Sequence, residues 1–342
     1  MAANNEVKIM KLLLKAGADP NLLDQNNTTP LSRAIERSDV SMVKSLLSHG
    51  AMVGLKRVYK DHDLFLAAKS GNLVRIKFLF KKGSPEQIKV RDNNGNTLLH
   101  MAAECGHQNV IEFLLKKGAQ INHKNHEGNS PLHLAVASRK AYALALLIKK
   151  GANVNARNNS GESPLHHAVW STIMVEKLLD AGANINARDN FSDTPLNHAV
   201  ENDNVKAVDK LLKSGADVNI RGFYGQTALH KATHNKDMVT LLLHHNADFE
   251  AIDDFGNTPI VSCAEHGKLE SLNLLIEAGA NLNVKNDLGE TPLHRAVERN
   301  SPTLVSALLS RGARSDIQNN VGVTPLHLAA DHIQDADFTV TM

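Results

Sequence analysis

Apolar residues recur along the chain with helical spacing, in short segments that come in pairs. Segments such as PLHLAVA (131–137) and NVIEFLLKKG (109–118) place Leu, Ile, Val and Ala at the intervals of an amphipathic helix. A polar stretch containing glycine follows each pair, for example NARNNSGES (155–163), and this composition is typical of a turn. The pattern predicts paired short helices separated by projecting turns, which we call fingers.

A four-residue box marks the start of each helix pair. It reads Ser-Pro-Leu-His at 130–133 and 163–166 and Thr-Pro-Leu-His at 291–294 and 324–327, with degenerate copies elsewhere. The proline slot of the box falls at positions 30, 63, 98, 131, 164, 195, 228, 259, 292 and 325, in steps of 31 to 35 residues. A second box, Gly-Ala-Asp/Asn-X-Asn, keeps the same phase. Because one helix pair cannot bury its apolar face alone, we expect the units to stack on a shared core.

Both boxes can be understood from local chemistry. Thr or Ser before Pro places a capping oxygen beside a ring that already has helical φ. Gly118 and Asn246 supply the left-handed residue that ends a second helix. The units starting near Ser163 and Thr227 lose two residues between their helices, so their inter-helix turns must be tighter. The finger within 50–63 lacks the second box and is expected to be irregular, and the next finger is two residues longer.

These boxes resemble the ankyrin repeat family over nearly the whole chain. The resemblance implies an all-α ankyrin repeat solenoid of stacked helix-turn-helix units with β-hairpin fingers, whose fingers and first helices line a concave groove. We expect about nine full repeats with partial repeats at both ends, a solenoid over 1–330 and a frayed tail over 331–342. Since the terminal repeats expose apolar edges, we also expect a piece of a longer protein or an assembly through those repeats.

The composition of the chain argues against several classes of function. The net charge of +2 gives no general attraction to nucleic acid or anionic membranes. No apolar run is long enough for a membrane-spanning helix, and the first residues turn polar too soon for a signal peptide. Two cysteines, Cys105 and Cys263, exclude a disulfide framework and fit a reducing compartment. We therefore expect a cytoplasmic protein, with the nucleus or a host-cell cytosol as alternatives.

The sequence contains no catalytic or metal-binding motif. It has no HExxH, no paired CxxC and no phosphate-binding loop, so we predict no enzymatic activity, no cofactor and no metal site. The chain has eighteen histidines, and the resemblance implies that those in the boxes bond the backbone between units; they are His100, His133, His166, His230, His294 and His327. Asparaginyl hydroxylation is known for the family, and Leu211, Asp217 and Asn219 fit its preferred pattern best, the alternative being a structural turn residue at Asn219.

Charged residues form two rows and an uneven distribution. A basic row occupies one finger slot: Arg91, Lys124, Arg157, Arg188, Arg221 and Lys285. An acidic row follows the small pair of the first helices: Glu36, Glu104, Glu201, Glu265, Glu298 and Asp331. The rows either pair across the groove or stay solvated. Residues 51–91 hold ten cations and three anions, whereas residues 248–290 hold nine anions and two cations, which either steers a partner or is ordinary surface variation.

An aromatic group marks the fingers of the C-terminal half. Phe191, Phe223, Tyr224 and Phe255 stand at or beside the residue before the turn glycine, and Trp170 occupies a first-helix slot nearby. These rings either bind a partner or pack between fingers, and Trp170 has the further alternative of filling the shortened turn. The predicted partner-binding set is completed by residues of the groove and the basic row: Glu201, His234, Arg188 and Arg221.

The preferred function is a non-enzymatic protein–protein interaction scaffold that holds a partner protein of unknown identity in its groove. One alternative is a substrate adaptor of a ubiquitin ligase, or a pathogen effector, within a larger protein. The other is a binder of nucleic acid or anionic lipid through the basic segment 51–91, which its few interleaved aromatic residues disfavour.

Overall fold

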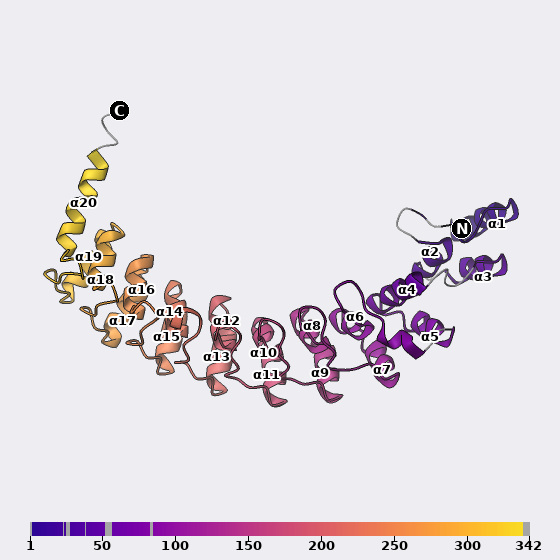
Figure 1. Cartoon of the computed structure of the whole chain (residues 1–342), viewed down its shortest axis with the longest axis horizontal. Coiled ribbons are helices and arrows are strands. Elements are labelled where there is room, and N and C mark those ends of the chain that lie inside the picture. The colour runs from indigo at the N-terminus through magenta and orange to yellow at the C-terminus, as the bar shows by residue number, and fades with distance from the viewer. Residues whose placement is uncertain are drawn as a thin grey trace. The chain divides into compact units, whose positions relative to one another are not determined.

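The computed structural model describes residues 2–22, 24, 28–37, 39–51, 57–82 and 85–337 and divides into two compact units, Met1–Ala152 and Asn153–Met342. Within each unit, short helices stand side by side in chain order and are joined by turns (Figure 1). The described ranges contain no β-strand, only an isolated antiparallel bridge between Arg91 and Thr97. The all-α class is confirmed, and none of the described helices has the length and apolar character needed to cross a membrane.

The first unit contains nine α-helices and a 3-10 helix in its described ranges. They are α1 (Ala2–Lys15), α2 (Pro30–Glu36), α3 (Val40–Ser48), α4 (Arg57–Lys69), α5 (Leu73–Lys82), η1 (Pro85–Lys89), α6 (Leu98–Cys105), α7 (Gln108–Lys116), α8 (Pro131–Ala137) and α9 (Ala141–Lys149).

The second unit continues the alternation of first and second helices. Its elements are α10 (Pro164–His167), η2 (Ala168–Trp170), α11 (Thr172–Asp180), α12 (Pro195–Glu201), α13 (Val205–Lys213), η3 (Phe223–Gly225), α14 (Ala228–Lys231), η4 (Ala232–His234), α15 (Lys236–His244), α16 (Pro259–His266), α17 (Leu269–Ala278), α18 (Pro292–Glu298), α19 (Pro302–Ser310) and α20 (Pro325–Asp337).

The predicted caps set the helix boundaries. At Ser130 the hydroxyl caps the third helical residue, His133, whose imidazole in turn accepts from the Ser130 backbone N–H. At the other end of the pair, Gly118 (φ 88°) and Asn246 (φ 60°) adopt the left-handed conformation that the sequence predicts. Each end of a helix pair therefore has its own polar partner, which keeps such short helices defined.

The two shortened units turn more tightly, as predicted. Their first helices, α10 and α14, have four residues each and pass directly into the 3-10 helices η2 and η4. Ordinary units such as that of α12 instead use a left-handed residue here, Asp203 at φ 54°. In the shortened units the first helix ends in a tighter 3-10 turn, which takes the place of the left-handed residue and makes up for the two missing residues.

Leucine and alanine of the boxes form the core. Leu165, Leu196, Leu229 and Leu293 are buried, and each first helix from α10 to α20 contacts the next one along the second unit. Cys263 is fully buried among them, as the sequence suggests, and burial raises the pKa of its thiol to about 12. Stacking therefore buries apolar surface continuously from repeat to repeat.

The fingers are turns rather than the paired strands of the expected β-hairpins. In one finger, Asp253 N donates to Asn257 O at 2.9 Å, as a hairpin would require. The returning N–H of Asn257 instead donates to the Asp253 carboxylate, also at 2.9 Å. Because that side chain takes the place of a backbone acceptor, strand pairing stops after one bond.

The end regions follow the predicted pattern with one difference. Helix α1 exposes Ile9, Leu12 and Leu13, in line with an apolar edge on the first repeat. Helix α20 continues to Asp337, beyond the expected end of the solenoid at residue 330, since neither Gly nor Pro follows Pro325 to interrupt it. Residues 338–342 of the predicted tail lie outside the described residues, as do residues 52–56 of the irregular finger. The longer finger contains η1.

Candidate functional site

The fingers of Asp189 and Asp253 are each held closed by a side chain at the base. Asp189 Oδ1 accepts the backbone N–H groups of Phe191 and Asp193 at 2.8 and 2.9 Å, and Asp253 binds Phe255 and Asn257 in the same way. This turn leaves the residue before the glycine position at the tip. The aromatic side chains at these tips are therefore presented by a rigid loop.

Neighbouring fingers are also bonded to each other. Asn190 N donates to Ser160 O, and Asp254 N donates to Tyr224 O, both at 2.9 Å. The same bond joins Asp287 N to Phe255 O at 3.0 Å. Since these fingers are anchored to their neighbours, residues at their equivalent tip positions lie next to each other.

Four rings form a continuous aromatic row over three fingers, consisting of Phe191, Phe223, Tyr224 and Phe255. Their ring centroids are separated by 5.2 Å (Phe191–Phe223), 3.9 Å (Phe223–Tyr224) and 5.7 Å (Tyr224–Phe255). Each side chain is nevertheless 38–59% exposed. The rings therefore pack between fingers and still present an apolar surface, and their contact with a partner stays a prediction.

The middle finger has its own construction. Gly222 stands where other fingers have Asp or Asn, and Asp193 of the preceding repeat occupies the space, its Oδ1 accepting from Phe223 N at 3.1 Å and from Asn197 Nδ2 at 3.0 Å. Tyr224 adopts a left-handed conformation at φ 53°, which is costly for a residue with a Cβ. Strain is thus retained at the center of the aromatic row.

Two members of the basic row, Arg188 and Arg221, bind neighbouring fingers instead of the acidic row. Arg188 donates to Ser192 O in its own finger at 3.3 Å and to Arg221 O in the next at 2.7 Å. Arg221 likewise donates to Gly225 O at 3.0 Å and to Asp254 Oδ1 at 2.8 Å. A long planar guanidinium reaches two fingers at once, so these cations join fingers along the stack.

The acidic residue Glu201 is paired with a cation that sequence analysis did not single out. Lys231 has a side chain only 7% exposed and contacts both Glu201 and Asp193, the latter at 3.2 Å. The lysine lies 38 residues from Asp193 in the chain, so no local pattern indicates the pair. A buried lysine between two carboxylates thus joins successive repeats.

Trp170 and His234 stand at equivalent positions, at the ends of η2 and η4, rather than in the aromatic row. Trp170 is about half exposed, so part of its surface is accessible to a partner. His234 Nδ1 lies 3.1 Å from Lys231 O, and its Nε2 lies 3.6 Å from Asp203 Oδ1. Contact of Trp170 or His234 with a partner stays a prediction.

Four of the box histidines have the structural role that the resemblance implies, namely a bond to the backbone of the next unit: His100, His166, His230 and His294. His230 Nδ1 accepts from Thr227 N at 3.2 Å, and its Nε2 donates to Asn257 O of the next unit at 3.0 Å. His294 makes the same pair of bonds, to Thr291 N and Val323 O. Burial lowers the pKa of both imidazoles, which keeps them neutral near pH 7.

Asn219 also takes part in bonding between repeats. Its Oδ1 accepts from Asp248 N at 2.8 Å, and its Nδ2 donates to Asn246 O at 3.3 Å. Leu211 is buried in α13, and Asp217 Oδ1 accepts the Asn219 N–H at 3.0 Å. These bonds support the structural interpretation, and hydroxylation of Asn219 stays a prediction.

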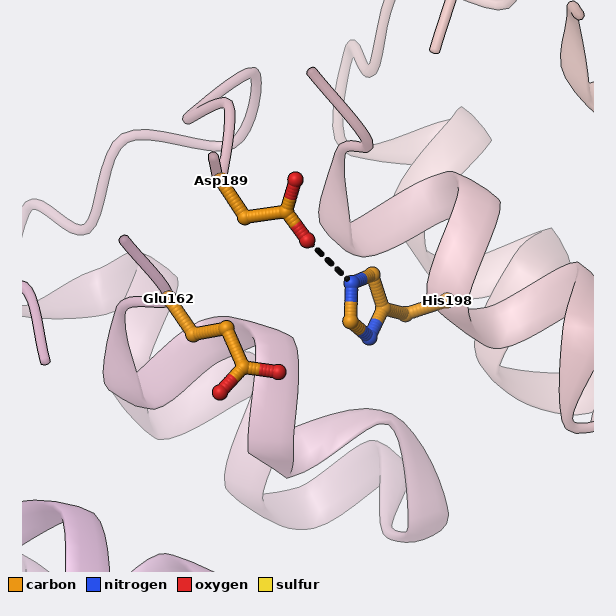
Figure 2. Close-up of side chains that lie close together, drawn as sticks. All are labelled: Glu162, Asp189 and His198. Carbon is orange, nitrogen blue, oxygen red and sulfur yellow. Dashed lines mark hydrogen bonds and ion pairs between the residues drawn. The ribbon is translucent and has the colours of Figure 1, made fainter. Parts of the chain in front are cut away.

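A group of ionisable side chains that the sequence did not reveal lies between two repeats of the second unit. Glu162 precedes α10, Asp189 begins the next finger and His198 projects from α12, and Figure 2 shows the three side chains approaching one space. His198 Nε2 lies 2.9 Å from Asp189 Oδ2, and one potential ligand atom from each residue lies within 4.8 Å of the other two. His167 Nε2 lies 3.3 Å from Glu162 Oε2.

Comparisons with known proteins agree with this architecture. The family model described as ankyrin repeats (3 copies) matches residues 1–82, 56–125, 118–189, 147–222, 173–253, 196–286 and 260–338. The ankyrin repeat domain of Bcl-3, a member of the IkappaB protein family, has a crystal structure that is similar at a TM-score of 0.55 and 33% identity. The match covers 59% of this chain and 95% of that one.

Curated relatives match over shorter stretches. Alpha-latrocrustotoxin-Lt1a of Latrodectus tredecimguttatus is 34% identical over 101 residues, covering 30% of this chain and 7% of the toxin. The putative E3 ubiquitin-protein ligase XBAT31 of Arabidopsis thaliana is 31% identical over 131 residues, covering 35% of this chain and 29% of that protein. The chain thus spans less than a third of either relative. The family model, in contrast, matches nearly the whole chain, which belongs to the ankyrin repeat family.

Proposed function

We propose that this chain is a non-enzymatic scaffold that binds a partner protein, with the aromatic row as its main contact. Ankyrin repeats generally mediate protein–protein interaction, and the chain consists of them. The observation that supports the aromatic row is the contact of four exposed rings on successive bonded fingers. A contiguous exposed apolar surface of this kind is typical of an interaction site.

The aromatic row suits binding energetically. Its rings are already ordered by contact with each other, so a partner that covers them immobilises few rotamers. Tyrosine and phenylalanine also bury a large area for few rotatable bonds. The apolar surface continues along the equivalent finger positions at Leu288 and Val321, which are exposed too. A partner segment that runs along the finger tips would therefore cover apolar surface throughout.

Charge suggests the chemistry of that partner segment. Residues 248–290, which include Phe255, contain nine acidic and two basic residues. Lys285 of this segment donates to Gln318 O, and Arg221 of the neighbouring finger binds Asp254, so these two cations are engaged within the fold. We propose an extended or helical peptide segment with apolar anchors and basic flanking residues as the partner.

The ubiquitin-ligase adaptor is a narrower form of the same proposal. It is prompted by relatives named as E3 ubiquitin-protein ligases, of which this chain matches only a part. The nucleic acid or lipid alternative receives less support, since Arg75 in the basic segment has a side chain only 5% exposed and binds Asp63 at 2.9 Å.

The test begins with affinity capture by the wild-type chain and identification of the bound protein by mass spectrometry. Binding of the purified partner is then measured for a double variant, Tyr224→Asn with Phe255→Ala. Asparagine is chosen because it tolerates the left-handed conformation at position 224. Loss of two central rings should weaken binding by about 30- to 1000-fold, which corresponds to about 2–4 kcal/mol.

Tyr142→Ala provides the matched control, because Tyr142 is an exposed tyrosine on α9, in the first unit. It should leave affinity unchanged, and both proteins should keep the wild-type melting temperature. Equal affinity of the double variant and wild type would contradict the role of the aromatic row. A steep salt dependence of binding to a nucleic acid or an anionic vesicle would favour the basic segment instead.

A further inference from the structure

The cluster of Glu162, Asp189 and His198 has the features of a prepared ligand set rather than of a surface ion pair. Asp189 and His198 belong to one repeat and Glu162 to the preceding one, so the three meet only because the repeats stack. The Asp189 side chain is 5% exposed, and His198 and Glu162 are about one-fifth exposed. The site is therefore mostly enclosed and still reachable from solvent.

We propose that Glu162, Asp189 and His198 bind one divalent transition-metal ion of the zinc class, which bridges two neighbouring repeats.

Each carboxylate is held in place by bonds to the residues around it. Asp189 uses Oδ1 to hold the finger through Phe191 N and Asp193 N, while Oδ2 faces His198. Glu162 Oε2 accepts from Asn158 Nδ2 at 2.8 Å and lies 3.3 Å from His167 Nε2. Such surrounding bonds are what fixes ligands in metal sites.

The chemistry of the donor atoms also suits a cation. Two carboxylates and one imidazole supply one potential ligand atom each, and these atoms lie within 4.8 Å of one another. In the metal-free state His198 Nε2–H donates to Asp189; on binding, that proton moves to Nδ1 through solvent and the Nε2 lone pair becomes the ligand.

The donor set selects the class of metal. One imidazole nitrogen and two carboxylate oxygens suit zinc and its neighbours, with water completing the coordination. Magnesium and calcium prefer oxygen ligands alone and in greater number. Among the described residues, no other group of three such side chains converges in this way. The equivalents of His198 in two other repeats are Lys231 and Arg295, which are cations and cannot serve as ligands.

The test uses the full chain, freed of metal by a chelator and titrated with Zn²⁺ by isothermal calorimetry near pH 7. Wild type should bind one Zn²⁺ ion per chain. The variants His198→Gln and Glu162→Gln should each bind Zn²⁺ at least about tenfold more weakly than wild type. Co²⁺ should give the visible absorption of a low-coordinate site in wild type only, and Mg²⁺ should not bind. The thermal midpoint of wild type should rise with Zn²⁺ and return on chelation.

His234→Gln is the matched control, since His234 also lies beside one carboxylate, with Nε2 3.6 Å from Asp203 Oδ1, but lacks the further ligands. It should bind Zn²⁺ as wild type does. Circular dichroism of the metal-free proteins shows whether each variant is folded. The proposal is overturned if wild type binds no ion, or if folded His198→Gln and Glu162→Gln both bind Zn²⁺ with wild-type affinity.

Discussion

A single imidazole connects adjacent repeats at the four-residue box. In the unit of α6, His100 Nδ1 accepts from Thr97 N at 3.1 Å, and its Nε2 lies 3.0 Å from Asn129 O. Because a backbone N–H can only donate, Nδ1 must be unprotonated and Nε2 carries the hydrogen. The fold therefore requires a neutral ring, and burial lowers the pKa of His100 to about 4.

This requirement predicts a loss of stability in mild acid. The pKa of His166 is also lowered to about 4, whereas an unfolded histidine has a pKa of 6.5. Between these two pKa values the unfolded chain binds more protons than the folded chain. The contribution of these histidines to the free energy of unfolding should therefore be largest above pH 6.5 and fall as the pH drops toward 4. Each of these two histidines should remove about 3 kcal/mol by pH 4. Urea titrations over a series of pH values measure the effect.

A variant of the box isolates the histidine contribution. His100→Asn is a suitable control, because Asn197 occupies the same slot in the unit of α12 and bonds Thr194 there. This variant should be less stable at neutral pH and lose less free energy on acidification. Glu162, with a pKa lowered to about 2, adds a loss below pH 4.5 in both proteins. A stability that rises between pH 6.5 and 4 would refute the neutral-ring account.

At the scale of elements, the finger of η3 depends on the repeat before it. A Cβ on Gly222 would lie 1.9 Å from Asp193 Oδ1 and 2.6 Å from Asn197 Nδ2. Asp193 in turn binds the buried Lys231. The glycine, the aspartate and the lysine thus form one arrangement that closes this finger without a side chain at its base.

The geometry of this finger predicts that asparagine, which is common at the equivalent position of other fingers, lowers stability at position 222. Gly222→Asn should lower the free energy of unfolding by about 1–3 kcal/mol, because the new side chain enters space that Asp193 fills. Asp253→Asn is the control, since asparagine occupies the equivalent position at Asn286 and binds the turn there. Denaturant melts measure both. Equal stability of Gly222→Asn and wild type would show that Asp193 can move away freely.

At the scale of the molecule, stability is shared between neighbours. In the second unit, α10 contacts α12, and α12 contacts α14, so each first helix supports the next. Apolar surface is buried mainly between consecutive repeats. A defect in one repeat should therefore weaken its neighbours first.

Leu165→Ala tests this distribution. Leu165 is fully buried in α10, and its truncation should cost about 2–5 kcal/mol. Amide hydrogen exchange should then speed up most in α10 to α13 and least in α18 and α19. Val321→Ala, at an exposed finger tip, should change neither quantity. Uniform acceleration across residues 153–337 would instead indicate one cooperative core.

The sequence determined the repeat, and with it the elements. The boxes place the caps, the left-handed residues Gly118 and Asn246 and the tight turns of the shortened units, because each of these features depends on a few adjacent residues. The phase of the repeat also placed the four rings on successive fingers. Even the bond from His100 to the next repeat follows once the stack is assumed.

The tertiary structure alone decided the direction of the long side chains. Arg188 and Arg221 point along the fingers rather than across the groove, and Lys231 is buried between Asp193 and Glu201. Glu162, Asp189 and His198 converge from two repeats although no motif spacing joins them. Their encounters depend on the translation and rotation between stacked repeats and on rotamers, which no pattern within one repeat encodes.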